Sequence, residues 1–446
     1  MRETRVAQIS IFENYSKHEF ALRLQQLSSL LDEYPEILSL IEKDLIDKTK
    51  KSTGRKGLTV ENIFRCLLLK QQLQVSYEQF AFHLSDSTSY RTFVRLPDQL
   101  NPSRSGLQST IRGVKPETLE EVHKMLSVAM LQKGDISMEK IRVDSTVVKS
   151  NITPPSDSQL LNDCVRVLSR HFAKIRDNTG VKFSFVDKRK ASKSLAFQIF
   201  NAKNADKEKL YPALLKLARV VLKQAERGLK KAIEKGNDSA ATKNWLAQVE
   251  HYRDLLVKII CQTERRVIKK EKVHSSEKIV SIFESHTDII VKGFRDVQYG
   301  HKINLASDQR GFITYLAIEE GNPGDKERFL PVMQAHKENF GCLPVSVACD
   351  GGYASQVNVK QGRDLGIKRV VFHKRVGISY QSMGVKKKTF KILRNFRAGI
   401  EGNISELKRS FGAGKATWKG HDGFKAFVWS SVISYNLVRL ARLASG

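Results

Sequence analysis

Hydrophobic residues in the first third of the chain recur at helical spacing. One apolar face, in residues 59–72, is formed by Val60, Ile63, Phe64, Leu67 and Leu68. Ser76 and Gln79 form the capping-box pattern that predicts the start of a second helix, and Pro116 opens a later one. Short helices joined by polar turns are typical of a helix-turn-helix DNA reader and equally of an ordinary helical bundle, so this pattern leaves both open.

The pattern changes abruptly at residues 141–148. Alternating β-branched residues there predict a strand, with Asp144 on the face opposite to Val143 and Ser145. Apolar residues then return to steps of three and four between residues 156 and 272. Gly236-Asn237-Asp238 interrupts this run, which predicts an antiparallel helical hairpin with one apolar seam and Lys- and Arg-rich outer faces.

The last third of the chain alternates strand and helix patterns. Residues 307–311, which end in a glycine, predict a hairpin connection between two of the strands. The predicted strands cover residues 299–305, 312–318, 345–349 and 368–372, and the predicted helices cover residues 322–339, 354–365 and the C-terminal region. Together with the first strand, this order predicts an α/β fold: a five-stranded mixed sheet flanked by helices, with a helical domain inserted after the first strand.

The charge balance indicates a class of partner. Lys and Arg number 76 and Asp and Glu 47, so the formal net charge is +29. A large positive field attracts nucleic-acid phosphates, although a ribosome-associated protein or a basic enzyme would also fit. The five cysteines include no C-x-x-C pair, which excludes a disulfide scaffold or a four-cysteine zinc module and favours a reducing compartment. We expect neither a signal peptide nor a membrane span.

Two aspartates stand where chemistry could take place. Asp144 lies inside an otherwise apolar strand, where a charge is costly unless it is paired or bound to a metal. Asp350 ends another strand, and the two glycines that follow it allow a backbone or ligand to approach closely. The alternatives are a structural pair between Asp144 and a buried arginine, and a simple turn at Asp350.

The C-terminal region contains a third acid in a cationic setting. Arg397, Glu401 and Lys408 fall within about 40° of one another on a helix, so they share one face. This arrangement suits a metal ligand beside phosphate-binding groups, and it also suits a surface ion pair. Three carboxylates on two strands and a helix are what a two-metal phosphoryl-transfer site requires. The sequence has no phosphate-loop, H-E-x-x-H or G-x-S-x-G motif, and we expect the isolated His301 to be structural.

Taken together, these motifs resemble those of DDE-type insertion-sequence transposases, most closely the ISNCY-type group. The segments that carry the resemblance are Arg-Val-Asp-Ser-Thr-Val-Val148, Ser-Asp-Ser-Gln-Leu-Leu-Asn162, Thr-Asp-Ile-Ile-Val-Lys-Gly293, Gln-Tyr-Gly-His-Lys302, Gly-Asn-Pro-Gly-Asp325, Asp-Gly-Gly-Tyr353, Asn-Phe-Arg-Ala-Gly-Ile-Glu401, the Leu-Lys-Arg409 run and Trp-Ser-Ser-Val-Ile-Ser-Tyr-Asn436. The resemblance implies a ribonuclease-H-like core in which Asp144, Asp350 and Glu401 are the catalytic, metal-binding acids.

The resemblance also implies DNA contacts and a metal. The family pattern Tyr-x2-Arg-x3-Glu-x6-Lys matches Arg397, Glu401 and Lys408, whereas Arg394 stands at the tyrosine position. This difference removes a stacking or hydrogen-bonding group near the donor DNA. By the same resemblance, Arg397, Lys408, Arg394 and Lys302 are expected to contact DNA, and the acids are expected to hold Mg²⁺, or Mn²⁺ in its place.

The implied activity is Mg²⁺-dependent DNA cleavage at element ends and strand transfer to target DNA. The implied domains are an N-terminal helical DNA-binding domain (1–135), the first part of the core (136–155), a helical insertion (156–285) and the rest of the core (286–446). A homodimer would act on paired terminal inverted repeats at the nucleoid, in the bacterial cytoplasm. Two rival functions stay open: a non-catalytic DNA-binding regulator derived from a transposase, and a structure-selective nuclease with the same core.

Overall fold

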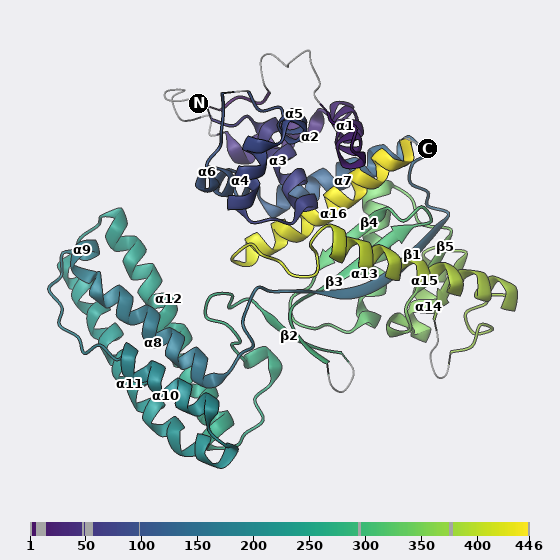
Figure 1. Cartoon of the computed structure of the whole chain (residues 1–446). Helices are drawn as coiled ribbons and strands as arrows, with labels where there is room; N and C mark the ends of the chain where they lie inside the picture. The colour runs from purple at the N-terminus through teal and green to yellow at the C-terminus, as the bar shows by residue number, and fades with distance from the viewer. Residues whose placement is uncertain are drawn as a thin grey trace. The chain divides into compact units, whose positions relative to one another are not determined.

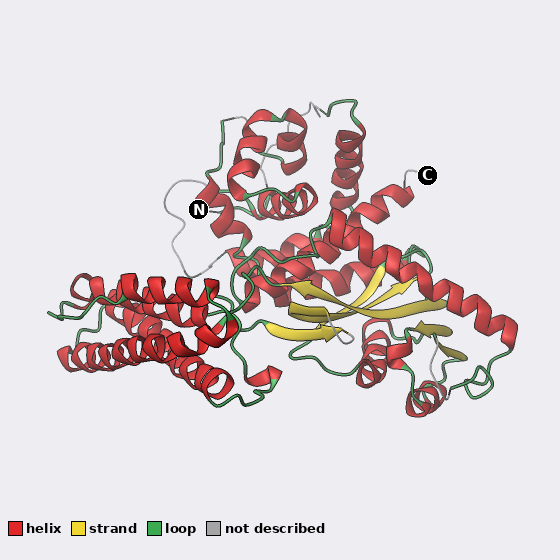
Figure 2. Ribbon diagram, turned by 60° about the horizontal axis from the view of Figure 1, so that its bottom comes forward, coloured by secondary structure: helices red, strands yellow, loops and turns green. Residues whose placement is uncertain are grey.

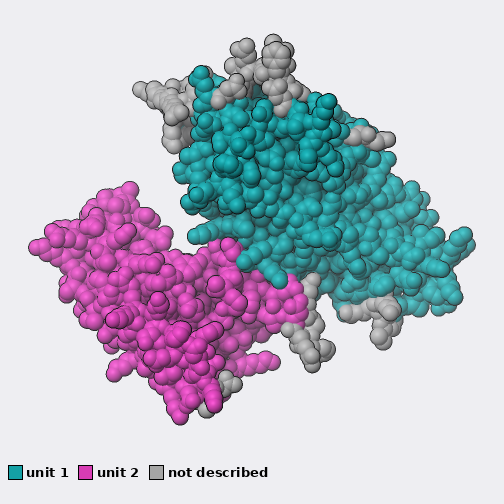
Figure 3. All heavy atoms as spheres, in the orientation of Figure 1, with its two compact units in different colours: residues 1–150, 301–446 teal, residues 151–300 magenta. Residues whose placement is uncertain are grey.

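The computed structural model describes residues 2–5, 15–46, 49, 57–97, 99–292, 296–373 and 378–444. Gly293, which ends one of the motifs above, lies outside these ranges. By its internal contacts the chain divides into two units, shown in different colours in Figure 3. Unit 1 comprises residues 1–150 and 301–446, and unit 2 comprises residues 151–300. Unit 2 is therefore an insertion in the sequence of unit 1.

The N-terminal part of unit 1 is helical, as predicted. Its helices are α1 (Glu19–Asp32), α2 (Glu36–Leu45), α3 (Val60–Leu73), α4 (Tyr77–Asp86), α5 (Thr88–Val94), α6 (Arg104–Ile111) and α7 (Pro116–Gln132). The capping box that opens α4 is confirmed, because the Gln79 amide donates to the Ser76 hydroxyl and the Ser76 amide donates to the Gln79 side chain. Nearly every residue of α3 is buried, so this helix lies at the centre of the helical region.

The predicted mixed sheet is confirmed in unit 1 (Figure 1). Its strands are β1 (Lys140–Lys149), β3 (Asp296–Asp308), β4 (Ile313–Ile318), β5 (Ser346–Cys349) and β6 (Arg369–Phe372). β3 lies beside β1, β1 pairs in parallel with β5, and β5 pairs in parallel with β6. β4 pairs with β3 in antiparallel orientation, as the predicted hairpin requires. This strand order agrees with a ribonuclease-H-like fold.

The remaining helices of unit 1 cover the sheet, and Figure 2 shows helices on both of its faces. They are α13 (Phe329–Phe340), α14 (Gln356–Asp364), α15 (Lys387–Ser410) and α16 (His421–Ala444). α15 packs against β1, β5 and β6, whereas α16 contacts β4 and also α1, α3 and α7. As a result, the N-terminal helices and the sheet share one continuous hydrophobic core. The predicted domain boundary at residue 135 stays a prediction.

Unit 2 is built around the predicted helical hairpin. Its helices are α8 (Asp157–Ala173), α9 (Ile175–Thr179), α10 (Arg189–Asn201), α11 (Asn204–Lys235) and α12 (Ala240–Thr263). α11 ends at Gly236, whose φ of +64° favours glycine, and α12 then packs back against α11. A separate core fills the seam, with Val221 and Val249 fully buried.

Unit 2 also contains a strand that the sequence analysis did not predict. β2 (Asp288–Lys292) pairs in antiparallel orientation with residues 296–300 at the beginning of β3. It has only three consecutive apolar residues, too few to show an alternating pattern. Among the described residues, no helix is long and apolar enough to cross a membrane. The five cysteines are all free thiols.

Candidate active site

The first two predicted acids are neighbours because of the register of two parallel strands. Val143 of β1 pairs with Cys349 of β5, so Asp144 and Asp350 follow one step further along the two strands. The Asp350 amide donates to the Val143 carbonyl, 3.3 Å away, which fixes this step. Adjacent strands lie about 4.8 Å apart, and the two carboxylates therefore lie side by side where β5 ends, with Asp144 still inside β1.

The third acid comes from α15, which packs across the same face of the sheet. Glu401 lies one helical turn after Arg397, and its carboxylate accepts two hydrogen bonds from that guanidinium, at 2.8 and 3.0 Å. Its side chain is 67 % exposed, so it lies at the open side of the group. α15, the middle of β1 and the end of β5 therefore supply one acid each, as the sequence analysis predicted.

Arg397 joins the three acids. One of its nitrogens, Nη2, lies 3.0 Å from Asp350 Oδ1, 3.0 Å from Glu401 Oε1 and 3.8 Å from Asp144 Oδ2. Arg397 is only 8 % exposed, and its Nε has no hydrogen-bond partner. Three carboxylates, of which the first and last are more than 250 residues apart in the sequence, therefore converge on one buried guanidinium nitrogen.

The environment of Asp144 disfavours its charged form. Its pKa is raised from 3.8 to about 6, first by burial and then by the neighbouring charge of Asp350. The Ser145 amide, which donates to Asp144 Oδ1 at 2.7 Å, and the charge of Arg397 oppose this increase. Burial thus dominates the increase, and the three carboxylates around a single arginine leave an excess of negative charge, which is the electrostatic setting of a cation site.

The even-numbered residues of β1 fix the position of α15. Arg142 donates to the Phe396 carbonyl and to the Asn403 side chain, while Lys408 donates to the Thr146 hydroxyl at 2.7 Å. These contacts, on either side of Asp144 along β1, place Arg397 and Glu401 of the helix over the acid.

Gly399 is required for this close packing. A Cβ atom at Gly399 would overlap the guanidinium of Arg142. The absence of a side chain at this position therefore allows α15 to approach β1 closely enough to bring Glu401 to the acids.

Comparison with known proteins agrees with this geometry. Residues 292–437 match the family model described as a transposase DDE domain, and residues 12–110 match the model described as a transposase domain. The chain belongs to the DDE transposase family. The first match includes Asp350 and Glu401 but begins after Asp144, so the assignment of Asp144 depends on the geometry. No curated protein and no solved structure matches the chain.

The residues present in this transposase fit a divalent metal ion, which the family generally uses. All three donors are carboxylates, the oxygen ligands that Mg²⁺ prefers. Three carboxylates share one arginine, Arg397, so a further cation beside them would be balanced by their remaining negative charge. Arg397 now occupies the point where they converge, so its guanidinium must withdraw from at least one of them when a metal binds.

A fourth carboxylate near the acids was not predicted as a site residue. Asp325 contributes to the raised pKa of Asp144. It also lies so close to Gly352 that a Cβ atom there would overlap its carboxylate. Gly352 therefore allows a close approach, but the group that approaches is the Asp325 side chain and not the backbone or ligand that was expected. The signal was present in the Gly-Asn-Pro-Gly-Asp325 motif, but its position beside Asp144 depends on the fold.

The partner of Asp325 is Lys302, which had been expected to contact DNA. Lys302 is 7 % exposed, and its ammonium lies 2.5 Å from Asp325 Oδ1 and donates to the Pro323 carbonyl at 2.8 Å. This geometry makes Lys302 a buried structural partner, without the open position that a phosphate contact needs. Of the expected DNA contacts on α15, Arg394 and Lys408 are half-buried and Arg397 is buried.

The turn after Asp350 is anchored from below by β3. The Tyr353 hydroxyl donates to the Asn304 side chain at 2.5 Å, and Asn304 in turn donates to Glu319 at 2.6 Å. Tyr353 and Asn304 are both fully buried. The Asp-Gly-Gly-Tyr353 motif is therefore a fixed turn that holds Asp350 in place.

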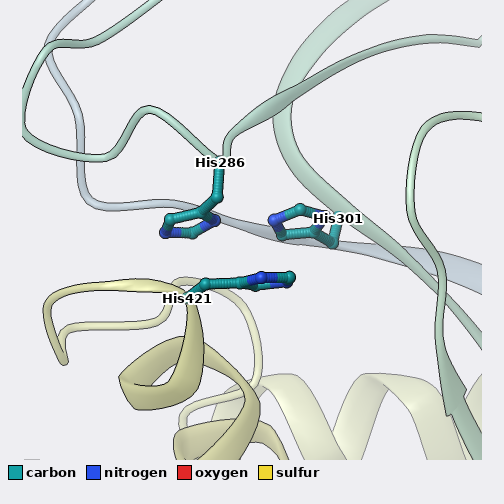
Figure 4. A group of neighbouring side chains, drawn as sticks. All are labelled: His286, His301 and His421. Carbon is teal, nitrogen blue, oxygen red and sulfur yellow. The ribbon is translucent and has the colours of Figure 1, made fainter. Parts of the chain in front are cut away.

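His301 was expected to be structural, and this stays a prediction. It is buried, and its ring stacks on that of His421 at a centroid distance of 5.2 Å and contacts the edge of Phe424 at 4.8 Å. Figure 4 shows the His301 and His421 rings beside each other. His286, which is also labelled there, belongs to unit 2, where its Nε2 lies 2.9 Å from Glu284 Oε2.

Proposed function

We propose that this chain is the transposase of an insertion sequence, of the ISNCY-type group, and that it cleaves DNA at the element ends and joins them to target DNA. The observation that supports this most strongly is the convergence of Asp144, Asp350 and Glu401 on one nitrogen of Arg397. A protein that only binds DNA gains nothing from three carboxylates facing phosphate. In the reaction, water attacks phosphorus and the bond to the 3′ oxygen breaks. The freed 3′-hydroxyl then attacks a phosphate of the target strand, and the bond from that phosphorus to the target's own 3′ oxygen breaks, so this oxygen leaves as a 3′-hydroxyl.

Asp144, Asp350 and Glu401 would hold the metal ions, Mg²⁺ or Mn²⁺, which supply Lewis-acid activation of the attacking oxygen and stabilise the leaving oxygen. Arg397 balances the acids in the metal-free protein. When bound metal ions balance the charge of these carboxylates instead, the Arg397 guanidinium would be free to donate to a phosphate oxygen beside them. Lys408 positions the site through Thr146, and Arg394 offers a further cation one turn before Arg397 on α15.

Unit 2 offers a surface for DNA on α11. Five exposed cations recur there at intervals of three and four: Lys216, Arg219, Lys223, Arg227 and Lys230. At 100° per residue they fall within about 80° of the helix circumference, so they form one stripe. A cationic stripe follows a phosphate backbone without reading its sequence, which suits an insertion that holds the element's terminal repeats. We propose that two copies of the chain act on paired ends at the nucleoid, in the bacterial cytoplasm.

The decisive experiment compares Asp350→Asn with the wild type on the DNA that flanks the gene. Short inverted repeats in that DNA would serve as the substrate, and strand nicking and end binding are measured separately with Mg²⁺ present. We expect Asp350→Asn to abolish nicking and to bind the ends within about threefold of wild type. Asp364→Asn, an exposed acid on α14, is the matched control and should cleave normally.

Three other outcomes would contradict the proposal. Undiminished cleavage by Asp350→Asn would refute the assignment of the acids. End binding by the wild type without any metal-dependent nicking would indicate a regulator. Cleavage of branched DNA irrespective of the repeats would indicate a structure-selective nuclease.

A further inference from the structure

A second cationic site lies in unit 1, lined by residues outside the acidic group. A cavity of about 560 Å³ opens between α3, α4, α6 and the segment 412–419 that follows α15. This volume is typical of sites that hold a small organic group. Its charged lining residues are Lys70, Arg104, Arg112, Lys415, Lys419 and a single carboxylate, Glu78. The excess of cations favours an anionic occupant.

Aromatic side chains form another part of the lining. Tyr77, Trp418 and Phe427 all border the cavity. Trp418 packs edge-on against Phe427, with their centroids 5.9 Å apart, so the indole has a fixed orientation. Cations interleaved with aromatic rings are typical of surfaces that bind unpaired nucleotides, because every base has a face that can stack.

Two buried donors at the cavity have no hydrogen-bond partner, and a buried ammonium beside them makes no ion pair in the described part of the chain. Lys70 is 7 % exposed, its ammonium lies 4.4 Å from the centroid of Tyr77, and within the described chain it makes no ion pair. Burial lowers the pKa of this ammonium to about 8. The Tyr77 hydroxyl and the Trp418 indole nitrogen are buried without a hydrogen-bond partner. Because buried polar groups are normally hydrogen-bonded, two such groups beside a buried ammonium without an ion pair indicate that a ligand with acceptor atoms belongs in this cavity.

The wall of the cavity is tied to the strand that carries Asp144. The Lys149 amide at the end of β1 donates to the Gly414 carbonyl at 3.2 Å, and the Ala416 amide donates to the Lys149 carbonyl at 2.8 Å. Five residues of strand separate Asp144 from Lys149, which corresponds to about 17 Å. The segment 412–419 therefore meets β1 at roughly the length of five base pairs from the acids, which is within the span of one bound DNA molecule.

We propose that this cavity binds one unstacked nucleotide of a DNA strand held at the acidic site, with its phosphate on the cationic lining and its base against Tyr77 and Trp418. The inference rests on the proposed function, because that function brings DNA to the acids. A DNA strand is favoured over a free nucleotide because the cavity wall is continuous with the catalytic strand.

The test measures binding of the full chain to two DNA probes in EDTA, so that cleavage plays no part. One probe is a 30-base-pair duplex with a single unpaired 2-aminopurine nucleotide, and the other is the same duplex fully paired. We expect the wild type to bind the first about tenfold more tightly, as one stacked base allows. Lys70→Met, which removes the ammonium and keeps the apolar stem, should lower this preference to less than about threefold.

Two further variants control the interpretation. Arg104→Gln changes an exposed lining residue that has no part in the core, so it tests the cavity even if Lys70→Met fails to fold, and it should also reduce the preference. Lys337→Met removes an equal charge from the exposed surface of α13 and should leave the preference intact.

Equal affinity for the two probes, or an unchanged preference in both cavity variants, would overturn the inference. Displacement of the unpaired probe by inorganic phosphate as readily as by dAMP would refute the stacking of a base. The outcome is separable from that of the proposed function, because Asp350→Asn should retain the preference whether or not it cleaves.

Discussion

Replacing Asp144 by Asn is predicted to stabilise the metal-free protein at neutral pH. Burial and the charge of Asp350 raise the pKa of Asp144 from 3.8 to about 6. Each pKa unit corresponds to about 1.4 kcal/mol, and the shift is about two units. The ionised carboxylate therefore lowers the free energy of unfolding by about 3 kcal/mol above pH 7. Asn has the shape of the neutral acid and avoids that cost. The same change removes a metal ligand, so a gain in stability should accompany a loss of DNA cleavage.

The sign of the effect depends on pH in a defined way. Because the pKa of Asp144 is higher in the folded chain than in the unfolded chain, the folded state binds the extra proton between pH 3.8 and about 6. The destabilisation by the ionised Asp144 carboxylate is therefore absent below this pH range and fully present above it. The advantage of Asp144→Asn should therefore be about 3 kcal/mol at pH 7.5 and about 1 kcal/mol at pH 4.5.

Thermal and urea unfolding in EDTA measure this difference. For a unit of roughly 300 residues, about 3 kcal/mol corresponds to a rise in Tm of about 5 °C. Added Mg²⁺ should stabilise the wild type more than the variant, because only the wild type keeps all three acids. Glu401→Gln is the matched control, since its side chain is 67 % exposed and its substitution should change stability by less than about 0.5 kcal/mol. A variant no more stable than wild type at pH 7.5, or an equal gain at both pH values, would refute the reasoning.

Two further predictions concern the packing around the acids. Gly399→Ala should lower the free energy of unfolding by about 1–3 kcal/mol, because the added methyl overlaps the Arg142 guanidinium. Gly402→Ala, on the same helix, meets no atom and should raise it by up to about 1 kcal/mol. Equal effects of the two substitutions in thermal unfolding would contradict the packing described for α15. Lys302→Met should destabilise by about 3 kcal/mol because it leaves Asp325 without its cation, and adding Asp325→Asn should restore at least half of that loss. Strictly additive costs in the urea double-mutant cycle would show that the pair does not interact.

Much of the local structure could be predicted from the sequence. The alternation around Asp144 predicted β1, the capping box at Ser76 predicted the start of α4, and the stepping around Gly236 predicted the α11–α12 hairpin; all three are confirmed. Such features depend on the period of the side chains and on the conformational preferences of single residues, and both can be read from a few consecutive positions. The order of strands and helices then limited the fold to few topologies, which is why the mixed sheet was predictable.

The contacts that make the site depend on the tertiary structure. Arg397 was predicted beside Glu401, four residues away, but its bonds to Asp350 and Asp144 depend on how α15 crosses the sheet. Sequence likewise placed Lys302 among the DNA contacts, and only packing revealed its burial against Asp325.

The sequence by itself therefore determined most of the elements and their order, and with the family resemblance it singled out the three acids. Tertiary structure decided which cation balances the acids and which fourth carboxylate, Asp325, lies beside them. The physical reason is the sequence separation over which the interactions act. Periodicity and capping act within a few residues, whereas strand register and helix packing join positions hundreds of residues apart, and the charges that meet there set the chemistry of the site.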